Sequence, residues 1–235
     1  MKKSAQRWAA AGGAALLVAA GASHASLVFL GTADLNGTGL GAVNTVLTMT
    51  SPASSTSESG AVGLSTTGST TTTGNTTAIT QTRTLAQAGT TTASNLRIVF
   101  NAAEPTPGSD ITLNSLVLTL QPASGATTPG LNFSSGSFTP ITFNTTQPGI
   151  GNAGFIFGLD APQAAAAQAA INAGATVIGL SASATNATGG PETFFVTSVT
   201  GAPPVVGAVP EPGTMALLAS GLFAIGGIAR RKKKN

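Results

Sequence analysis

The sequence predicts an all-β protein, an antiparallel β-sandwich or jelly roll with one short crossover helix. Short β-prone runs recur along the 235-residue chain, and Gly, Pro, Asn and Ser separate them. Runs at this spacing are typical of sandwiches and jelly rolls. Roughly eight to ten strands are expected. Eight candidate runs begin at or near Ser26, Ala42, Leu96, Ile111, Ile141, Gly154, Thr176 and Thr193.

Two segments predict local features. In ITLNSLVLTL, residues 111–120, the apolar alternation changes phase around Ser115, which indicates a β-bulge. The segment TGGPET, residues 188–193, has the Gly and Pro residues of a tight turn. We interpret it as the turn of a hairpin that joins the last two strands.

One segment, DAPQAAAAQAAINAG at residues 160–174, predicts the crossover helix. Asp160 is expected to cap its N-terminus, Pro162 lies in its first turn and Gly174 follows its end. Its Ala-rich body indicates a packing element.

Residues 50–94 are dominated by Ser and Thr. Such a tract offers little apolar surface, so we expect its Gly-rich centre to be a flexible loop or linker. AITQTRTL, residues 78–85, alternates well enough to form an edge strand. In an exported protein the hydroxyls would be sites of O-linked glycosylation. An unmodified, solvated loop is an equally good interpretation.

The first 25 residues are typical of a signal peptide. A basic start is followed by an apolar run from Trp8 to about Ala20, which is shorter than the roughly 20 residues of a transmembrane span. Ser23-His24-Ala25 fits the small side-chain pocket of signal peptidase. We therefore expect cleavage between Ala25 and Ser26.

The expected exported body, residues 26–209, lacks the residue types that nucleic-acid binding and most catalytic mechanisms require. It holds two Arg against six acids, so nucleic acid is not an expected partner. It contains no His, Lys, Cys, Trp or Tyr, which excludes catalytic triads, Schiff bases and tetrahedral zinc sites. A glycosidase-type carboxylate pair remains formally possible, but the acids are scattered singly. We expect no enzyme activity and no cofactor.

One weak metal motif lies near the first strand. Asp34 and Asn36 place oxygen ligands at alternate positions before Gly39, as a calcium loop does. Thr45 stands where such a loop carries its bidentate Glu. An ordinary turn is therefore favoured over a calcium site.

The C-terminal 26 residues, 210–235, have three parts. Pro210 and Pro212 prevent a helix from continuing upstream of the apolar segment 214–229, which leaves Glu211 on an extended, accessible segment. That segment would be about 24 Å long as a helix, slightly short of a bilayer core of about 30 Å. A stop-transfer block follows, which the positive-inside rule places in the cytoplasm, and it consists of Arg230, Arg231, Lys232, Lys233 and Lys234.

This tail, VPEPGTMALLASGLFAIGGIARRKKKN, resembles the PEP-CTERM sorting signal of Gram-negative bacteria. The resemblance implies recognition by an exosortase, a transpeptidase-like membrane protease, while the chain is held transiently in the inner membrane. It also implies loss of the tail, delivery to the cell surface or beyond, and a link to exopolysaccharide and biofilm.

We therefore expect a non-enzymatic surface or matrix protein that is processed at both ends. One alternative is a calcium- or glycan-binding module that uses Asp34 and Asn36, or the loops around Thr188 to Glu192. The other is an unprocessed, tail-anchored envelope protein.

The mature composition gives a spectroscopic prediction. Trp8 is the only Trp, and the chain has no Tyr. If the signal peptide is removed, the secreted form will show only phenylalanine fine structure in its ultraviolet spectrum and no tryptophan fluorescence. Tryptophan emission from secreted material would mean that Trp8 is retained and that the predicted cleavage is wrong.

Overall fold

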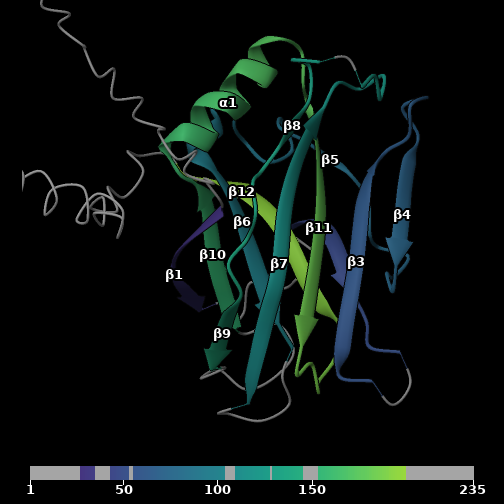
Figure 1. Ribbon diagram of the computed structural model, residues 1–235, viewed down its shortest axis with the longest axis vertical. Helices are drawn as coiled ribbons and strands as arrows, with labels where there is room; N and C mark the ends of the chain where they lie inside the picture. Colours follow the sequence, from purple (N-terminus) through teal and green to yellow (C-terminus); the bar gives the residue numbers. More distant parts are fainter. Residues whose placement is uncertain are drawn as a thin grey trace, which may run out of the picture. The chain divides into compact units, whose positions relative to one another are not determined.

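Two antiparallel β-sheets packed face to face form the body of the protein in the computed structural model of the chain (Figure 1). The structure describes residues 27–34, 43–52, 55–103, 109–127, 129–144 and 153–199. All of them belong to a compact unit that ends at Val199. For this part of the chain, the predicted all-β antiparallel architecture with one α-helix is confirmed.

The first sheet, sheet A, has five strands. Their spatial order is β1-β10-β6-β12-β2, so no two neighbours are consecutive in sequence. The strands are β1 (Leu27–Asp34), β10 (Ala153–Leu159), β6 (Leu96–Ala102), β12 (Glu192–Ser198) and β2 (Asn44–Met49).

The second sheet, sheet B, has seven strands. Five of them follow the order β4-β3-β11-β7-β8, while β5 pairs with β11 and β9 pairs with β7. The strands are β4 (Thr70–Gly74), β3 (Ser57–Leu64), β11 (Val177–Thr185), β7 (Asp110–Gln121), β8 (Phe133–Ser134), β5 (Arg83–Thr84) and β9 (Ile141–Asn144).

Each of the eight β-prone runs contains a strand, and the predicted bulge is present. In the pairing of β7 with β11, Ser115 lies opposite Ser183 and Leu113 lies opposite Ala184. Asn114 is therefore the extra residue of β7. The bulge keeps Leu113 and Leu116 on the same, buried side of the sheet despite their odd spacing.

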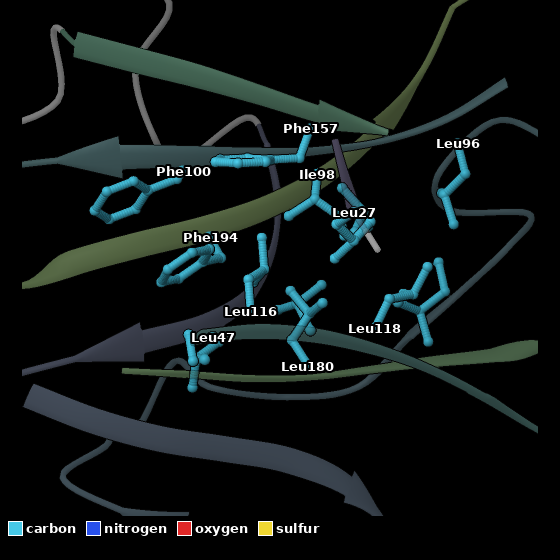
Figure 2. Close-up of a cluster of buried hydrophobic side chains, with 14 of the residues drawn as sticks. Leu27, Leu47, Leu96, Ile98, Phe100, Leu116, Leu118, Phe157, Leu180 and Phe194 are labelled. Carbon is cyan, nitrogen blue, oxygen red and sulfur yellow. The ribbon is translucent and has the colours of Figure 1, made fainter. Parts of the chain in front are cut away.

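The core lies between the two sheets and is made of Phe and aliphatic side chains (Figure 2). Sheet A contributes Phe100 and Phe194, whose rings stack with centroids 4.8 Å apart. Sheet B faces them with Leu116 and Leu180, which are almost completely buried. Because inward positions alternate with outward ones along every strand, the Ser and Thr residues between these positions face away from the core.

The predicted helix is α1, Ala161–Asn172, and it connects β10 of sheet A to β11 of sheet B at one end of the sandwich (Figure 1). Asp160 caps it as expected, since its carboxylate accepts a hydrogen bond of 2.9 Å from the Gln163 amide. Gln168 fixes α1 to the 3₁₀ turn Ala93–Asn95 by accepting a 2.9 Å hydrogen bond from the Ala93 amide.

The prediction that the centre of the Ser/Thr tract is a flexible loop or linker is wrong. Residues 57–64 and 70–74 form β3 and β4, which pair with each other in sheet B. Val62 is buried on the inward side of β3, and β-branched Thr suits the extended backbone of β4. Pairing of β3 with β11 and the buried apolar residues Val62, Leu85, Ala88 and Ala93 tie the tract to the core. Of the edge strand expected at residues 78–85, only Arg83–Thr84 is a strand.

The predicted hairpin at residues 188–193 is also wrong. The strands on either side of it lie in different sheets: β11 pairs with β3, β5 and β7, and β12 pairs with β2 and β6. The amides of the connection bond to other segments, Ala187 to the Thr56 carbonyl and Gly190 to the Ala103 carbonyl, each at 2.9 Å. Gly and Pro signalled a chain reversal correctly, but they do not specify whether the flanking strands pair.

The face-to-face packing predicts a large penalty for removing one core ring. Phe194→Ala would delete a fully buried side chain that stacks on Phe100, so we expect it to lower the free energy of unfolding by about 3–5 kcal/mol. Chemical denaturation followed by circular dichroism measures this. The control Ile79→Ala alters a side chain that is 56% exposed and should change stability by less than about 0.5 kcal/mol. Equal effects of the two would contradict the assigned core.

Candidate functional site

Most of the sequence-predicted processing residues lie outside the described part of the chain. These are the cleavage pair Ala25 and Ser26, the motif Pro210 to Pro212, the span 214–229 and the block Arg230 to Lys234. Within the described part, no helix is long and apolar enough to cross a membrane.

A groove of about 500 Å³ lies on the outer face of sheet B, across β4, β3, β11, β7 and β8. It is hollow because small residues occupy the outward positions of its central strands, namely Ala61 and Gly63 in β3 and Ser181 in β11. Larger outward side chains border it on both sides, Thr71 from β4 and Thr119 from β7. We call this feature the outer groove.

The lining of the outer groove is electrically neutral. Gln121 holds one wall in place, because its side-chain oxygen accepts a 3.0 Å hydrogen bond from the Leu64 amide. Asn132 donates to the Ala126 carbonyl at 3.0 Å, and its Oδ1 has no partner among the described residues. The described residues that line the groove include no acid, base or cation. Such a surface can exchange hydrogen bonds with a hydroxyl-rich ligand, and it offers no group for acid–base catalysis.

Beside the groove, β4 forms an edge of sheet B, and its five residues, Thr70–Gly74, are all exposed. Thr71 and Thr73 point toward the outer groove. Alternation places Thr70 and Thr72 on the opposite face of the strand, and the Thr70 hydroxyl lies 3.0 Å from that of Thr82. This part of the Ser/Thr tract is thus ordered, yet the threonines of β4 remain exposed to solvent.

The two arginines of the body and its two buried glutamates lie at opposite ends of the sandwich. Arg97 and Arg83 lie at the end that carries α1, because Arg97 pairs with Gly158 near the end of β10, and Arg83 pairs with Ile178 near the start of β11. Glu58 and Glu192 lie at the opposite end, where β3 and β12 begin and where β2 and β11 finish. We call this opposite end the distal end.

Arg97 is itself buried, with 3% of its surface exposed. Its Nη1 donates hydrogen bonds of 2.8 Å to the carbonyls of Ser94 and Leu96. Burial lowers the pKa of this guanidinium below its ordinary value. Arg97 therefore satisfies backbone carbonyls at the start of β6, and it is not placed to neutralise the acids at the distal end.

Most of the weak calcium loop that the sequence suggested lies outside the described residues. Asp34 is the last residue of β1 and pairs with Ala153, while Asn36 lies outside the described residues. Glu192, from the other predicted ligand loop, begins β12 and is fully buried. Because β10 and β6 separate β1 from β12, the backbones of Asp34 and Glu192 are about 14 Å apart across the sheet. The described residues include no group of three His, Cys, Asp or Glu side chains that could hold a metal ion.

Sequence reasoning missed two residues of the distal end, Ser51 and Glu58. The Ser51 hydroxyl donates a 2.9 Å hydrogen bond to Glu58 Oε1. The available signal was that Glu58 is the only charged residue between Asp34 and Arg83. Glu58 lies four residues before Val62, so the alternation along β3 places both side chains on the same, buried side of the strand.

The comparisons with known proteins concern the tail. Residues 208–233 match the model of the PEP-CTERM protein-sorting motif. No curated protein and no solved structure matches the chain.

A C-terminal sorting signal is a feature of exported proteins. The chain carries a PEP-CTERM protein-sorting motif, as the resemblance of its tail indicated. The motif implies that an exosortase processes the protein and that its destination is extracellular.

Proposed function

We propose that this protein is a non-enzymatic component of the cell surface or of an exopolysaccharide matrix, and that an exosortase releases it from its C-terminal tail. One observation carries the proposal: the sorting motif at residues 208–233 follows closely on a β-domain whose last strand ends at Ser198. The domain is the cargo, and the tail is the signal that retains it in the inner membrane until processing. Signal peptidase removes the N-terminal segment before that step.

Two features of the body support a structural role. Residues 26–209 lack His, Lys, Cys, Trp and Tyr, which removes the groups that most catalytic mechanisms use. The described outer groove and its border strand β4 instead present neutral hydroxyl groups. Such a surface is compatible with a polysaccharide environment, because it can exchange hydrogen bonds with sugar hydroxyls without a charge to desolvate.

A glycan-binding module is the second candidate, and the outer groove is the observation that favours it. Its volume of about 500 Å³ lies within the range of small-ligand sites. The lining aromatic residue, Phe133, is only 7% exposed, so no aromatic platform for a sugar ring is available there. Calorimetry with host polysaccharide separates the two candidates, since saturable binding favours the module.

The sorting proposal predicts opposite fates for two tail variants. Replacing Pro210, Glu211 and Pro212 with Ala removes the extended segment offered to the exosortase, so the chain should stay in the membrane fraction with its C-terminus intact. Replacing the basic block 230–234 with Ser removes the stop-transfer charge, so uncut chain should appear outside the cell. Fractionation followed by mass spectrometry of the C-terminal peptides distinguishes these outcomes.

A matched control lies a few residues upstream of the motif. Replacing Pro203 and Pro204 with Ala makes a similar change outside residues 208–233 and should leave release unaffected. The unprocessed tail-anchor alternative makes a different prediction, because the Pro210 to Pro212 variant would then behave like the wild-type protein.

We further propose that the exposed threonines of β4 carry O-linked glycan, which predicts a mass for native secreted material above that of the bare polypeptide. Replacing Thr70 to Thr73 with Val keeps the β-branched shape and removes the hydroxyls, so the excess mass should fall. Thr45→Val is the control, because Thr45 is only 6% exposed. Intact mass spectrometry that finds native protein at the bare polypeptide mass would refute the glycosylation.

A further inference from the structure

The strand β4 forms an open edge of sheet B. It pairs with β3 on one side, and no described strand pairs with its other side (Figure 1). All five of its residues, Thr70–Gly74, are exposed. A strand in this position presents unpaired backbone N–H and C=O groups to solvent, and such a row of groups is a template for pairing with another chain.

The pairing of β4 with β3 determines which backbone groups face the open edge. Just past β4, the Asn75 amide donates a 2.8 Å hydrogen bond to the Ser59 carbonyl. Hydrogen-bonded pairs alternate with non-bonded pairs along an antiparallel ladder, so Thr73 and Thr71 direct their N–H and C=O groups toward β3. The residues of β4 that direct these groups toward the open edge are Thr70, Thr72 and Gly74.

The chain covers the neighbouring edge of the sandwich and leaves this one open. The segment that follows β4 runs along β2, the edge strand of sheet A. There the Thr77 amide donates to the Thr48 carbonyl at 3.1 Å, and the Gln81 amide donates to the Val46 carbonyl at 3.0 Å. Charged side chains, Lys above all, and Pro are common protections of an open edge, but residues 59–82 contain no charged residue and no Pro. The open edge of β4 therefore lacks these protections against pairing.

We propose that the open edge of β4 pairs with β4 of a second copy of this chain, in antiparallel orientation about a two-fold axis at Thr72. Such an axis brings a strand next to its own copy, so a charged strand would repel itself, whereas the sequence of β4, TTTTG, has no charge. With the axis at Thr72, Thr70 lies opposite Gly74 of the second copy, and all three outward residues of β4 take part. The two adjacent registers leave either Thr70 or Gly74 without a partner in the other β4, so they form fewer hydrogen bonds.

This pairing joins sheet B of one copy to sheet B of the other. Because the axis is perpendicular to the joined sheet, the outer faces of the two copies point the same way, and their neutral outer grooves lie on one continuous surface. A pairing of five residues buries little surface, so the contact is weak and depends on a high local concentration of the protein. A matrix or a crowded cell surface provides that concentration. The contact goes beyond the proposed function and does not depend on exosortase processing.

Cysteine cross-linking tests the contact directly, because the chain has no cysteine of its own. In the proposed register, Thr71 lies opposite Thr73 of the second copy as a non-bonded pair, with Cα atoms about 4.5 Å apart, which a disulfide can span. The full-length chain is expressed without glycosylation, since glycan on β4 would hinder the pairing, and is purified in mild detergent. After mild oxidation, a mixture of the Thr71→Cys and Thr73→Cys variants should form several times more disulfide-linked dimer on a non-reducing gel than either variant alone.

Thr91→Cys is the matched control for cross-linking, because Thr91 is an exposed threonine outside β4. Adding Thr72→Lys to both cysteine variants places two like charges at the axis, so the dimer should be lost. Thr91→Lys adds the same charge elsewhere and should leave the dimer yield unchanged, and circular dichroism verifies that both lysine variants are folded. The proposal is overturned if the mixture forms no more dimer than Thr91→Cys, if either cysteine variant alone cross-links as well as the mixture, or if Thr72→Lys has no effect.

Discussion

The packing of two apolar sheet faces against each other is the interaction on which the rest of this structure depends. The chain has no cysteine, and residues 26–209 contain only two basic residues, so disulfides are excluded and ion pairs can contribute little to the body. The rings of Phe100 and Phe194 and the leucines of β7 therefore carry the stability of the fold. Because the core stabilises the fold, the outward faces need few charged residues. The outer groove of sheet B is lined there by small hydroxyl side chains.

The sequence predicted the apolar strands well because each one carries its own periodicity. The phase change at Ser115 and the Asp160 cap are local features, and both appear in the structure as expected. The errors concern pairing between distant segments. The tract around Thr70–Gly74 looked unstructured because its order depends on β3 and, through β3, on β11, and neither pairing is visible in the tract itself.

The candidate sites divide in the same way, into local sequence features and contacts between distant segments. The sorting motif could be recognised from sequence alone, because an enzyme reads it as a linear segment and its parts occur in a fixed order. Ser51 could not be connected to the Ala187 carbonyl, because this contact joins segments that lie far apart in the sequence. A turn-like stretch at residues 188–193 also conceals that the chain there changes sheets, which is what brings the Ala187 carbonyl to Ser51.

We propose separate tasks for the body and the tail: the cysteine-free β-domain is the exported product, and the C-terminal 26 residues retain it in the inner membrane until an exosortase acts. The most direct test of this account is peptide mapping of the wild-type protein recovered from outside the cell. The account predicts complete coverage of the β-domain and no peptides from the segment between Met215 and Arg230. Recovery of that segment from released protein would show that the tail is retained, and exosortase processing would then not be the route by which this protein leaves the membrane.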